Sequence, residues 1–488
     1  MRLDFTTLGY YTWFLPAVVV AVMVLARHRK APQMGLILLA SYVFFWLASG
    51  WHVILLATST CADWFIAKRI AASEDQKTKK RLLIATLTLN LGLLATFKYL
   101  DMLIDTYGLV QLRGDFLPHI PRAELLLPVG ISFYTFQTMS YSIDVYRGKY
   151  PPYASFVDFA AYAAFFPQLV AGPIVRADHF LEQIEEPLTM KERNFRLAFT
   201  FILYGLVKKV VFADNVALHV DAVFTEGVDL GNTALVWWAT LCFGIQIYCD
   251  FSAYSDIAIG SALLLGIRLP ENFKTPYAAR SPQDFWRRWH ISLSTWLRDY
   301  LYISLGGSRK GQRRLYIALM TTMALGGLWH GASWNFVLWG VVHGLILIGH
   351  RLLVARPFVQ EAFERKRLRV PLVITGWFIT QVLVFLTWLI FRVEDTKMLM
   401  EAISGFLFLQ GEFDVAAARE VLPDVQNLTT VLVVVFILMH GISGRLGRLR
   451  DRLSEGSPIL WGVFAGISIV AMLYLRPSES SEFIYFRF

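Results

Sequence analysis

"LYIALMTTMALGGLWHGASWNFVLWGVVHGLILIG" occupies residues 315–349 and contains no acidic residue, lysine or arginine. A helix that crosses the hydrocarbon core of a bilayer needs about 20 mostly apolar residues. Gly326, Gly327 and Gly331 would let two backbones approach closely or let a helix kink. The stretch therefore predicts two membrane-embedded helices, with His330 between them or at their break.

Long apolar stretches also occur in the rest of the chain. The whole chain is 56% hydrophobic and 17% charged, whereas a soluble domain carries about a quarter charged residues. No Pro/Gly/Ser-rich linker divides it. We predict an all-α polytopic membrane protein with a single membrane-embedded domain over 1–488 and roughly eleven to thirteen transmembrane or re-entrant helices. The predicted spans are 10–26, 35–49, 51–67, 82–99, 195–213, 233–266, 315–329, 333–354, 370–391, 428–441 and 458–475, and the shorter or interrupted segments are 125–145, 156–175, 288–305 and 397–409.

The net charge of +9 is carried by short basic clusters between the apolar segments. Such clusters are topology signals and lipid-headgroup contacts, so we expect membrane lipids as partners and no nucleic acid. The clusters at 26–30, 67–81, 307–314 and 364–369 are expected on the cytoplasmic side. The first apolar run lacks a cleavage site of small residues and is predicted to be a spanning helix rather than a signal peptide.

The three cysteines do not indicate a disulfide framework. Cys242 and Cys249 would lie about 10.5 Å apart along one helix, beyond the reach of a bridge. Neither has a partner at metal-ligand spacing, so both are expected to be buried apolar residues. Phosphate-binding loops, zinc helices and nucleophile elbows are absent from the sequence. We therefore expect no metal site.

A first polar segment in apolar surroundings is "FWRRWHISLSTWLRDYLYISLGG" at 285–307. On one helix, Arg287, His290, Ser294 and Arg298 would form a single polar stripe. Tryptophans and tyrosines surround this stripe, as at a membrane interface. The pattern fits a substrate-facing stripe or an interfacial helix that binds lipid headgroups equally well.

His330 lies between Trp329 and Trp334, which would supply flat apolar walls. Burial disfavours the imidazolium form, so the ring would be neutral and able to accept a proton, as a general base must. The alternative is a buried histidine that is hydrogen-bonded within the core. His343 follows thirteen residues later, about 220° around a helix, and is expected to face away from His330 and to pack.

Two acidic residues, Asp250 and Asp256, lie in the apolar stretch 245–260. They could form a proton relay, but pairing with Arg287, Arg288 or Arg298 is favoured because buried charges need partners. The stretch 165–180 contains Pro167, Pro173 and Gly172, which predict a broken helix and a cavity wall.

Five stretches taken together resemble the membrane-bound O-acyltransferases. They are "PVGISFYTFQTMSYSIDVYRG" (128–148), "FFPQLVAGPIVR" (165–176), "YCDFSAYSDIAIG" (248–260), "FWRRWHISLSTWLRDYLY" (285–302) and "LWHGASWNFVLWG" (328–340). The resemblance is strongest to the bacterial branch that acts on alginate and teichoic acids. It runs from about residue 80 to the C-terminus, with a motif-bearing core at about 80–355 and C-terminal helices at 370–488.

The resemblance implies a ring-like bundle of tilted helices around a central tunnel. It implies that His330 is catalytic and that His290 is a second functional position. A thioester donor would enter from the cytoplasm, and a hydroxyl acceptor, often on a separate extracytoplasmic SGNH-type acyltransferase, would approach from outside. Asn335 or a backbone N–H at the glycine-rich break could stabilise the oxyanion.

On these grounds we expect an acetyltransferase of the bacterial inner membrane that serves exopolysaccharide O-acetylation. Acetyl-CoA or an acyl carrier protein would be the donor, with no permanently bound cofactor, and Arg309, Lys310, Arg313 and Arg314 could attract its phosphates. The alternatives are a D-alanyl or lipid O-acyltransferase and a transporter or flippase. The aromatic C-terminus, with Phe483, Tyr485, Phe486 and Phe488, would line the acceptor side, dock the partner or simply anchor the chain.

Overall fold

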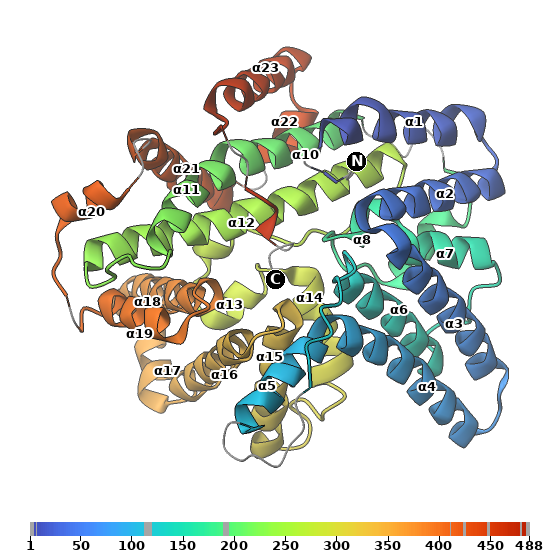
Figure 1. Cartoon of the computed structure of the whole chain (residues 1–488), viewed down its shortest axis with the longest axis horizontal. Coiled ribbons are helices and arrows are strands. Elements are labelled where there is room, and N and C mark those ends of the chain that lie inside the picture. The colour runs from blue at the N-terminus through green and yellow to red at the C-terminus, as the bar shows by residue number, and fades with distance from the viewer. Residues whose placement is uncertain are drawn as a thin grey trace. The chain divides into compact units, whose positions relative to one another are not determined.

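The structure is a computed structural model that describes residues 4–5, 7–111, 120–188, 195–409, 411–422, 426–446, 449–478 and 481–484. Within these ranges the regular elements are helices and there is no strand (Figure 1), which confirms the all-α prediction. Backbone contacts divide the chain into two compact units. Unit 1 is Met1–Ile202 with Tyr254–Pro270, and unit 2 is Leu203–Ala253 with Glu271–Phe488.

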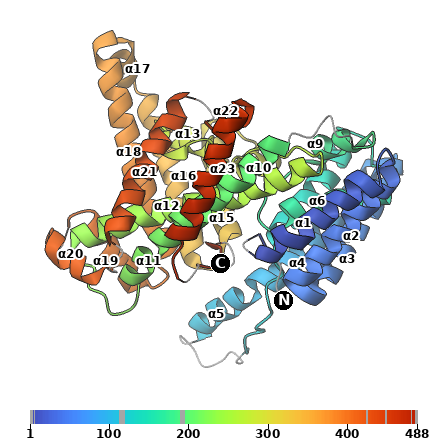
Figure 2. The same cartoon turned by 90° about the horizontal axis from the view of Figure 1, so that it is seen from above.

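Unit 1 is built around α2, α3, α4, α6 and α7, which pack against one another (Figure 2). A buried polar pair joins α3 to α4: the Asn90 amide donates to both carboxylate oxygens of Asp63 at 2.9 and 3.1 Å. The elements of unit 1 are η1 Tyr10–Phe14, α1 Leu15–Val20, η2 Ala21–Leu25, α2 Lys30–Ser49, η3 Gly50–His52, α3 Val53–Ala72, α4 Gln76–Leu94, η4 Ala95–Tyr99, α5 Leu100–Gln111, α6 Ile131–Tyr146, α7 Phe156–Ala164, α8 Phe166–Leu169, α9 Ala177–Leu181 and η5 Glu182–Ile184.

Unit 2 holds the remaining elements, while α10 and α12 each contribute residues to both units. These elements are α10 Phe195–Val207, η7 Lys208–Ala213, α11 Asp214–Val223, α12 Thr233–Leu264, η8 Pro276–Ala278, α13 Pro282–Trp286, α14 Ile291–Trp296, η9 Leu297–Tyr302, α15 Gln312–His330, α16 Trp334–Val354, α17 Pro357–Glu364, α18 Lys366–Arg392, α19 Thr396–Phe406, α20 Val415–Val421, α21 Gln426–Leu446, α22 Leu449–Glu455 and α23 Pro458–Leu475.

Six helical stretches of the described chain are long and apolar enough to cross a membrane. Each coincides with predicted spans, and the first, Lys30–Ala72, contains two of them. The other five are Gln76–Gly108, Thr233–Leu264, Trp334–Val354, Lys366–Arg392 and Pro458–Leu475. These stretches support a multi-pass membrane protein, while the number of eleven to thirteen segments stays a prediction.

Helix α23 illustrates what a lipid-facing element looks like in this chain. Its sequence is apolar on every side, yet only Ser468 is buried among its residues. Ile459 is 77% exposed and Tyr474 is 82% exposed. Such a surface would be unfavourable in water, because it would leave large apolar side chains exposed to the solvent. A bilayer around α23 removes that cost.

The opening stretch of sequence forms a hairpin of α15 and α16, and two glycines set how closely these helices approach. A Cβ added to Gly327 would lie 2.1 Å from the carbonyl oxygen of Phe336, and one added to Gly340 would lie 2.2 Å from that of Met323. Only glycine permits this backbone contact, as in other membrane helix pairs with small residues at the interface. The close packing fixes the end of α15 against the start of α16.

The segment 285–307 differs from its prediction. It is not one helix: α13 ends at Trp286, α14 begins at Ile291, and His290 between them has φ 42° and ψ 56°. The predicted single stripe of Arg287, His290, Ser294 and Arg298 is therefore wrong. Left-handed backbone is rare for a residue with a Cβ and is not visible in hydrophobic periodicity.

Candidate active site

His330 is the last residue of α15, at the predicted break between two apolar helices. It is 5% exposed. The helix ends there because Gly331 is extended, with φ −162° and ψ 160°, and Ser333 then caps α16 by accepting a hydrogen bond from the Asn335 N–H at 3.3 Å. The sequence thus places a polar ring at the end of a helix whose last turns are otherwise apolar.

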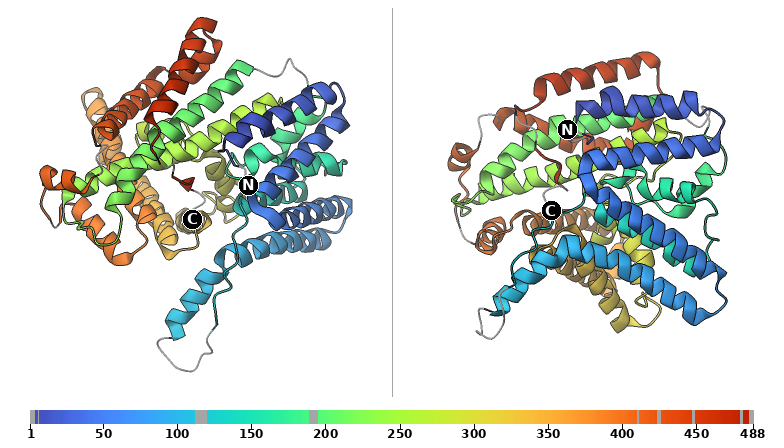
Figure 3. Two further views of the ribbon diagram at one scale, coloured as in Figure 1. Left: turned by 45° about the horizontal axis from the view of Figure 1, so that its top comes forward. Right: turned by 45° about the vertical axis from the view of Figure 1, so that its right-hand side comes forward.

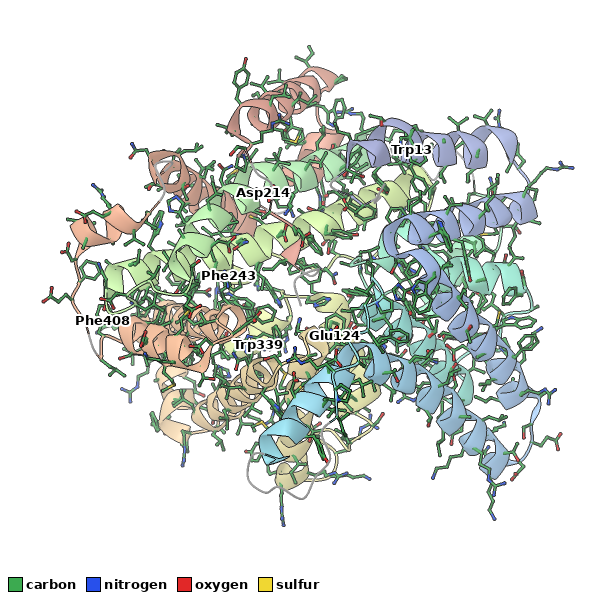
Figure 4. The ribbon with its side chains drawn as sticks, in the orientation of Figure 1. Trp13, Glu124, Asp214, Phe243, Trp339 and Phe408 are labelled. Atoms are coloured by element: carbon green, nitrogen blue, oxygen red, sulfur yellow. The ribbon has the colours of Figure 1, made fainter. Side chains whose placement is uncertain are left out.

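Aromatic rings surround the His330 imidazole. Its centroid lies 5.1 Å from that of Trp329, 5.1 Å from that of Trp339 and 5.4 Å from that of Phe391. Trp339 comes from α16 and is labelled in Figure 4, while Phe391 comes from the end of α18. Three helices therefore contribute aromatic rings to the surroundings of His330.

His290 is the second ring of this cluster, and the structure brings it to His330. The two imidazole centroids are 6.2 Å apart, and Trp329 lies 5.6 Å from His290. His290 is fully buried and also meets Phe251 of α12 edge to face at 4.6 Å. We call His290, His330, Trp329, Trp339 and Phe391 the aromatic site.

Asn272 holds the strained backbone at His290. Its carbonyl oxygen accepts from the Ile291 N–H at 2.9 Å, and its side-chain oxygen accepts from the Ser292 N–H at 3.1 Å and from the Ser292 hydroxyl at 2.6 Å. A left-handed residue persists only where its surroundings fix it, and such residues cluster at functional sites. Sequence reasoning missed Asn272, because no motif marks an asparagine whose partner lies twenty residues away.

His343 packs among aromatic rings, as predicted. Since α15 and α16 are separate helices, the angle of 220° along one helix does not apply to the pair His330 and His343. The His343 ring lies 4.5 Å from Trp339, the residue that also contacts His330, and 5.0 Å from Trp286. The spacing of Trp339 and His343 by four residues on one helix was the available signal.

Two residues that were expected beside His330 have different surroundings. Trp334 is 55% exposed. The Asn335 amide donates to the carbonyl oxygens of Val393 and Glu394, at 2.9 Å each, and so ties the start of α16 to the end of α18. This contact gives Asn335 a structural task, and its role toward an oxyanion stays a prediction.

The arginines of segment 285–302 lie near the surface of unit 2. Arg287 is exposed. Arg288 pairs with Asp284 at 2.8 Å, and Arg298 pairs with its neighbour Asp299 at 2.6 Å. The Ser294 hydroxyl donates to the backbone oxygen of Trp289 at 3.2 Å.

Asp250 is paired, as favoured from the sequence, but its partner is not one of these arginines. Lys209 of η7 lies 2.8 Å from Asp250 and 2.9 Å from Asp214 of α11. The arginine partners predicted for Asp250 are therefore wrong, because the pairing is made by a lysine forty-one residues earlier in the chain. Asp256 is buried and belongs to unit 1.

At the C-terminus, Phe483 and Ile484 are 2% and 3% exposed. Phe483 lies 6.5 Å from Phe251, the ring that contacts His290. Tyr485, Phe486 and Phe488 lie outside the described residues. Cys242 and Cys249 are buried free cysteines, as predicted. No group of three or more metal-ligating side chains was found among the residues that the structure describes.

Comparison with known proteins agrees with the motifs. Residues 151–391 match the family described as MBOAT, membrane-bound O-acyltransferase family. The chain is 38% identical to the probable alginate O-acetylase AlgI of Pseudomonas putida, over 93% of this chain and 94% of that protein. It is 33% identical to the peptidoglycan O-acetyltransferase of Helicobacter pylori, over 82% and 78%. It is 28% identical to the teichoic acid D-alanyltransferase of Streptococcus thermophilus, over 60% and 74%.

Proposed function

Because this chain belongs to the membrane-bound O-acyltransferase family, we propose that it moves an acetyl group from a thioester to a hydroxyl, with His330 as the general base. Family membership makes the chain an O-acyltransferase. The acetyl group, its donor, its acceptor and the base are the proposed parts. The observation that carries the proposal is the pair of buried imidazoles, His330 and His290, 6.2 Å apart among aromatic rings.

The proposed reaction uses the neutral form of His330. The imidazole takes the proton of the acceptor hydroxyl while the oxygen attacks the thioester carbonyl carbon. A carbon–oxygen bond forms and the carbon–sulfur bond breaks. The thiolate leaves and takes the proton from the imidazolium, which restores neutral His330. The apolar surroundings keep water away and so protect the thioester from hydrolysis.

We propose that His290 orients the substrate beside His330. Both imidazoles contact Trp329, and the backbone that follows His290 is fixed by Asn272. A fixed ring close to the base suits positioning, which can lower a barrier by several kcal/mol. His290→Asn keeps a residue that tolerates left-handed backbone. It should fold normally and lose transfer about tenfold or more, whereas unchanged turnover would reduce His290 to a structural role.

The donor proposed is acetyl-CoA or an acylated carrier protein, which share a phosphate-bearing thioester. Arg309, Lys310, Arg313 and Arg314 are exposed around the start of α15, and His330 is its last residue. A helix of 19 residues is about 28 Å long. This separation would let the basic residues bind the phosphates while the thioester reaches His330.

The acceptor proposed is a hydroxyl on the extracytoplasmic side, on a separate SGNH-type acyltransferase that passes the group to an exopolysaccharide. The relatives named as an alginate O-acetylase and a peptidoglycan O-acetyltransferase support acetyl transfer to a glycan. The relative named as a D-alanyltransferase supports the alternative acyl group. The proposed location is the bacterial inner membrane, with the acyl group passing through a tunnel between the two sides.

The transporter alternative is weakened by the contacts of Asp250. An ion path needs a carboxylate that can exchange partners, but Asp250 binds both Lys209 and the Ile484 N–H, at 2.8 and 2.6 Å. Such pairing is what a structural charge requires in a membrane interior.

The test uses the full chain in proteoliposomes with a radiolabelled acetyl thioester. Labelled acetyl-CoA and a labelled acyl carrier protein are supplied separately, with a soluble glycan or a purified SGNH-type partner as acceptor. Label should pass to one acceptor, and His330→Ala should abolish the transfer in protein that remains monodisperse. Solute flux without label transfer, or full transfer by His330→Ala, would overturn the proposal.

A further inference from the structure

Lys209, Asp214 and Asp250 form a buried ionic cluster in unit 2. Their side chains are 6%, 3% and 2% exposed. The lysine comes from η7, the wide helical turn between α10 and α11, and α11 runs beside α12 in Figure 3. Burying two carboxylates and one ammonium is costly unless every charge is hydrogen-bonded. The other groups that bind these three side chains therefore indicate which part of the chain the cluster holds in place.

Each member of the ionic cluster binds the C-terminal segment 481–484. Lys209 Nζ donates to the Ser481 carbonyl oxygen at 2.8 Å, the Ser481 hydroxyl donates to Asp214 at 2.7 Å, and the Ile484 N–H donates to Asp250 at 2.6 Å. An ammonium has three donors, and those of Lys209 meet Asp214, Asp250 and Ser481. The segment completes the pairing of the cluster, and Figure 1 shows it in red beside α12.

Helix α11, which carries Asp214, also binds the chain just before this segment. The Asn215 amide donates to the carbonyl oxygen of Leu475, the last residue of α23, at 2.7 Å. Asn215 follows Asp214 in α11. Chain termini are usually poorly ordered unless they are tied down. Here α11 fixes the chain at Leu475 and again at Ser481.

The bound segment lies one ring away from His290. Phe251 follows Asp250 on α12, and its ring contacts His290 at 4.6 Å and Phe483 at 6.5 Å. Asp250 and Phe251 are consecutive, so one turn of α12 binds the segment by its carboxylate and the aromatic site by its phenyl ring. A shift of the segment would change the packing of Phe251 against His290.

We propose that Lys209, with Asp214 and Asp250, is a positioning cluster that holds segment 481–484 as part of the wall behind His290. Lys209 acts through the segment rather than on the reacting atoms. The inference rests on the proposed function only for its activity measurement. The position of the segment can be measured without any substrate.

The first experiment measures how well the segment is held. Ile484→Cys keeps the backbone N–H that Asp250 binds and places a thiol at a buried position, in a Cys61→Ser background. Maleimide labelling of the full chain in nanodiscs should be slow. Adding Lys209→Met should speed it at least tenfold, and Lys209→Arg should restore protection. Arg392→Met, which removes the ion pair to Asp221, is the matched control and should leave the rate unchanged.

Equal labelling rates for the Lys209→Met protein and its parent, which retains Lys209, would overturn the proposal. If Lys209→Met fails to fold, Ser481→Ala gives a milder test, because it removes only the two contacts of the hydroxyl, to Asp214 at 2.7 Å and from Lys209 Nζ at 3.3 Å. It should raise the labelling rate a few-fold. An unchanged rate for Ser481→Ala would then count against the cluster as the anchor.

The second experiment asks whether Lys209 acts through the segment. Acetyl transfer is compared in four proteins: wild type, Lys209→Met, a chain ending at Ser478, and the chain that combines both changes. We expect Lys209→Met to slow transfer at least tenfold in the full chain and less than twofold in the shortened one. Multiplying effects would show that Lys209 acts independently and would overturn the proposal. If wild type transfers no acetyl group, the proposed function fails, while the labelling result still decides the role of the cluster.

Discussion

Unit 2 buries polar groups in two different ways. In the ionic cluster, Lys209 lies within 2.9 Å of both Asp214 and Asp250, and the C-terminal segment supplies further bonds. In the aromatic site, by contrast, His330 and His290 are packed against rings of tryptophan and phenylalanine. Buried charges that are fully paired suit a structural task. A buried imidazole can accept and return a proton, so this arrangement suits the proton transfer proposed for His330.

The largest expected effect concerns the ionic cluster. Lys209→Met leaves two buried carboxylates without their cation, which should lower the free energy of unfolding by about 3–5 kcal/mol. The triple variant Lys209→Met, Asp214→Asn and Asp250→Asn removes all three charges and should recover most of this loss. Thermal unfolding in detergent measures both. If the triple variant is as unstable as Lys209→Met, the loss of stability does not come from the two carboxylates that Lys209→Met leaves unpaired.

A smaller effect is expected where the hairpin positions the aromatic site. Gly340→Ala places a Cβ 2.2 Å from the Met323 carbonyl oxygen, so α15 and α16 must separate, at about 1–3 kcal/mol. Gly349→Ala is the matched control, because its added Cβ meets nothing within 4 Å. Turnover and unfolding temperature should fall for Gly340→Ala alone. Equal behaviour of the two variants would show that close helix contact does not matter for the site.

The smallest expected loss of stability is that of Asn335→Ala, a variant that distinguishes a structural role of Asn335 from oxyanion stabilisation. Asn335→Ala removes the bonds to Val393 and Glu394 and should cost about 1–2 kcal/mol of stability. Turnover per folded molecule should then stay nearly unchanged. If Asn335 stabilised an oxyanion, its loss would instead lower turnover about 100-fold or more. Steady-state rates normalised to folded protein decide between these outcomes.

The sequence was most informative where local composition decides structure. The apolar runs predicted each candidate span, and the glycines around His330 predicted the helix break that the structure contains. At 285–307 the same reasoning failed, because hydrophobic periodicity does not show the left-handed turn at His290 or the bond of Ser292 to Asn272 that follows it. The pairing of Asp250 with Lys209 could not be predicted from the sequence either. Lys209 meets Asp250 only after η7 packs against α12, which is tertiary structure.

The proximity of His290 and His330 shows the same limit. Neither periodicity nor spacing predicts that two histidines forty residues apart on different elements lie close together. Both were predicted as functional positions only from the resemblance to a family. The structure adds that Trp329 lies against each ring. It also shows His343 packed against Trp339, in agreement with the packing role expected for it.

His330 and His343 offer the most direct test of the account, because both are buried histidines in contact with Trp339. Acetyl transfer should be measured for His330→Ala and His343→Ala in protein of matched stability. The account predicts that His330→Ala loses about 100-fold or more, while His343→Ala keeps turnover within about fivefold. Equal losses in the two variants, or substantial transfer by His330→Ala, would contradict the assignment of His330 as the base.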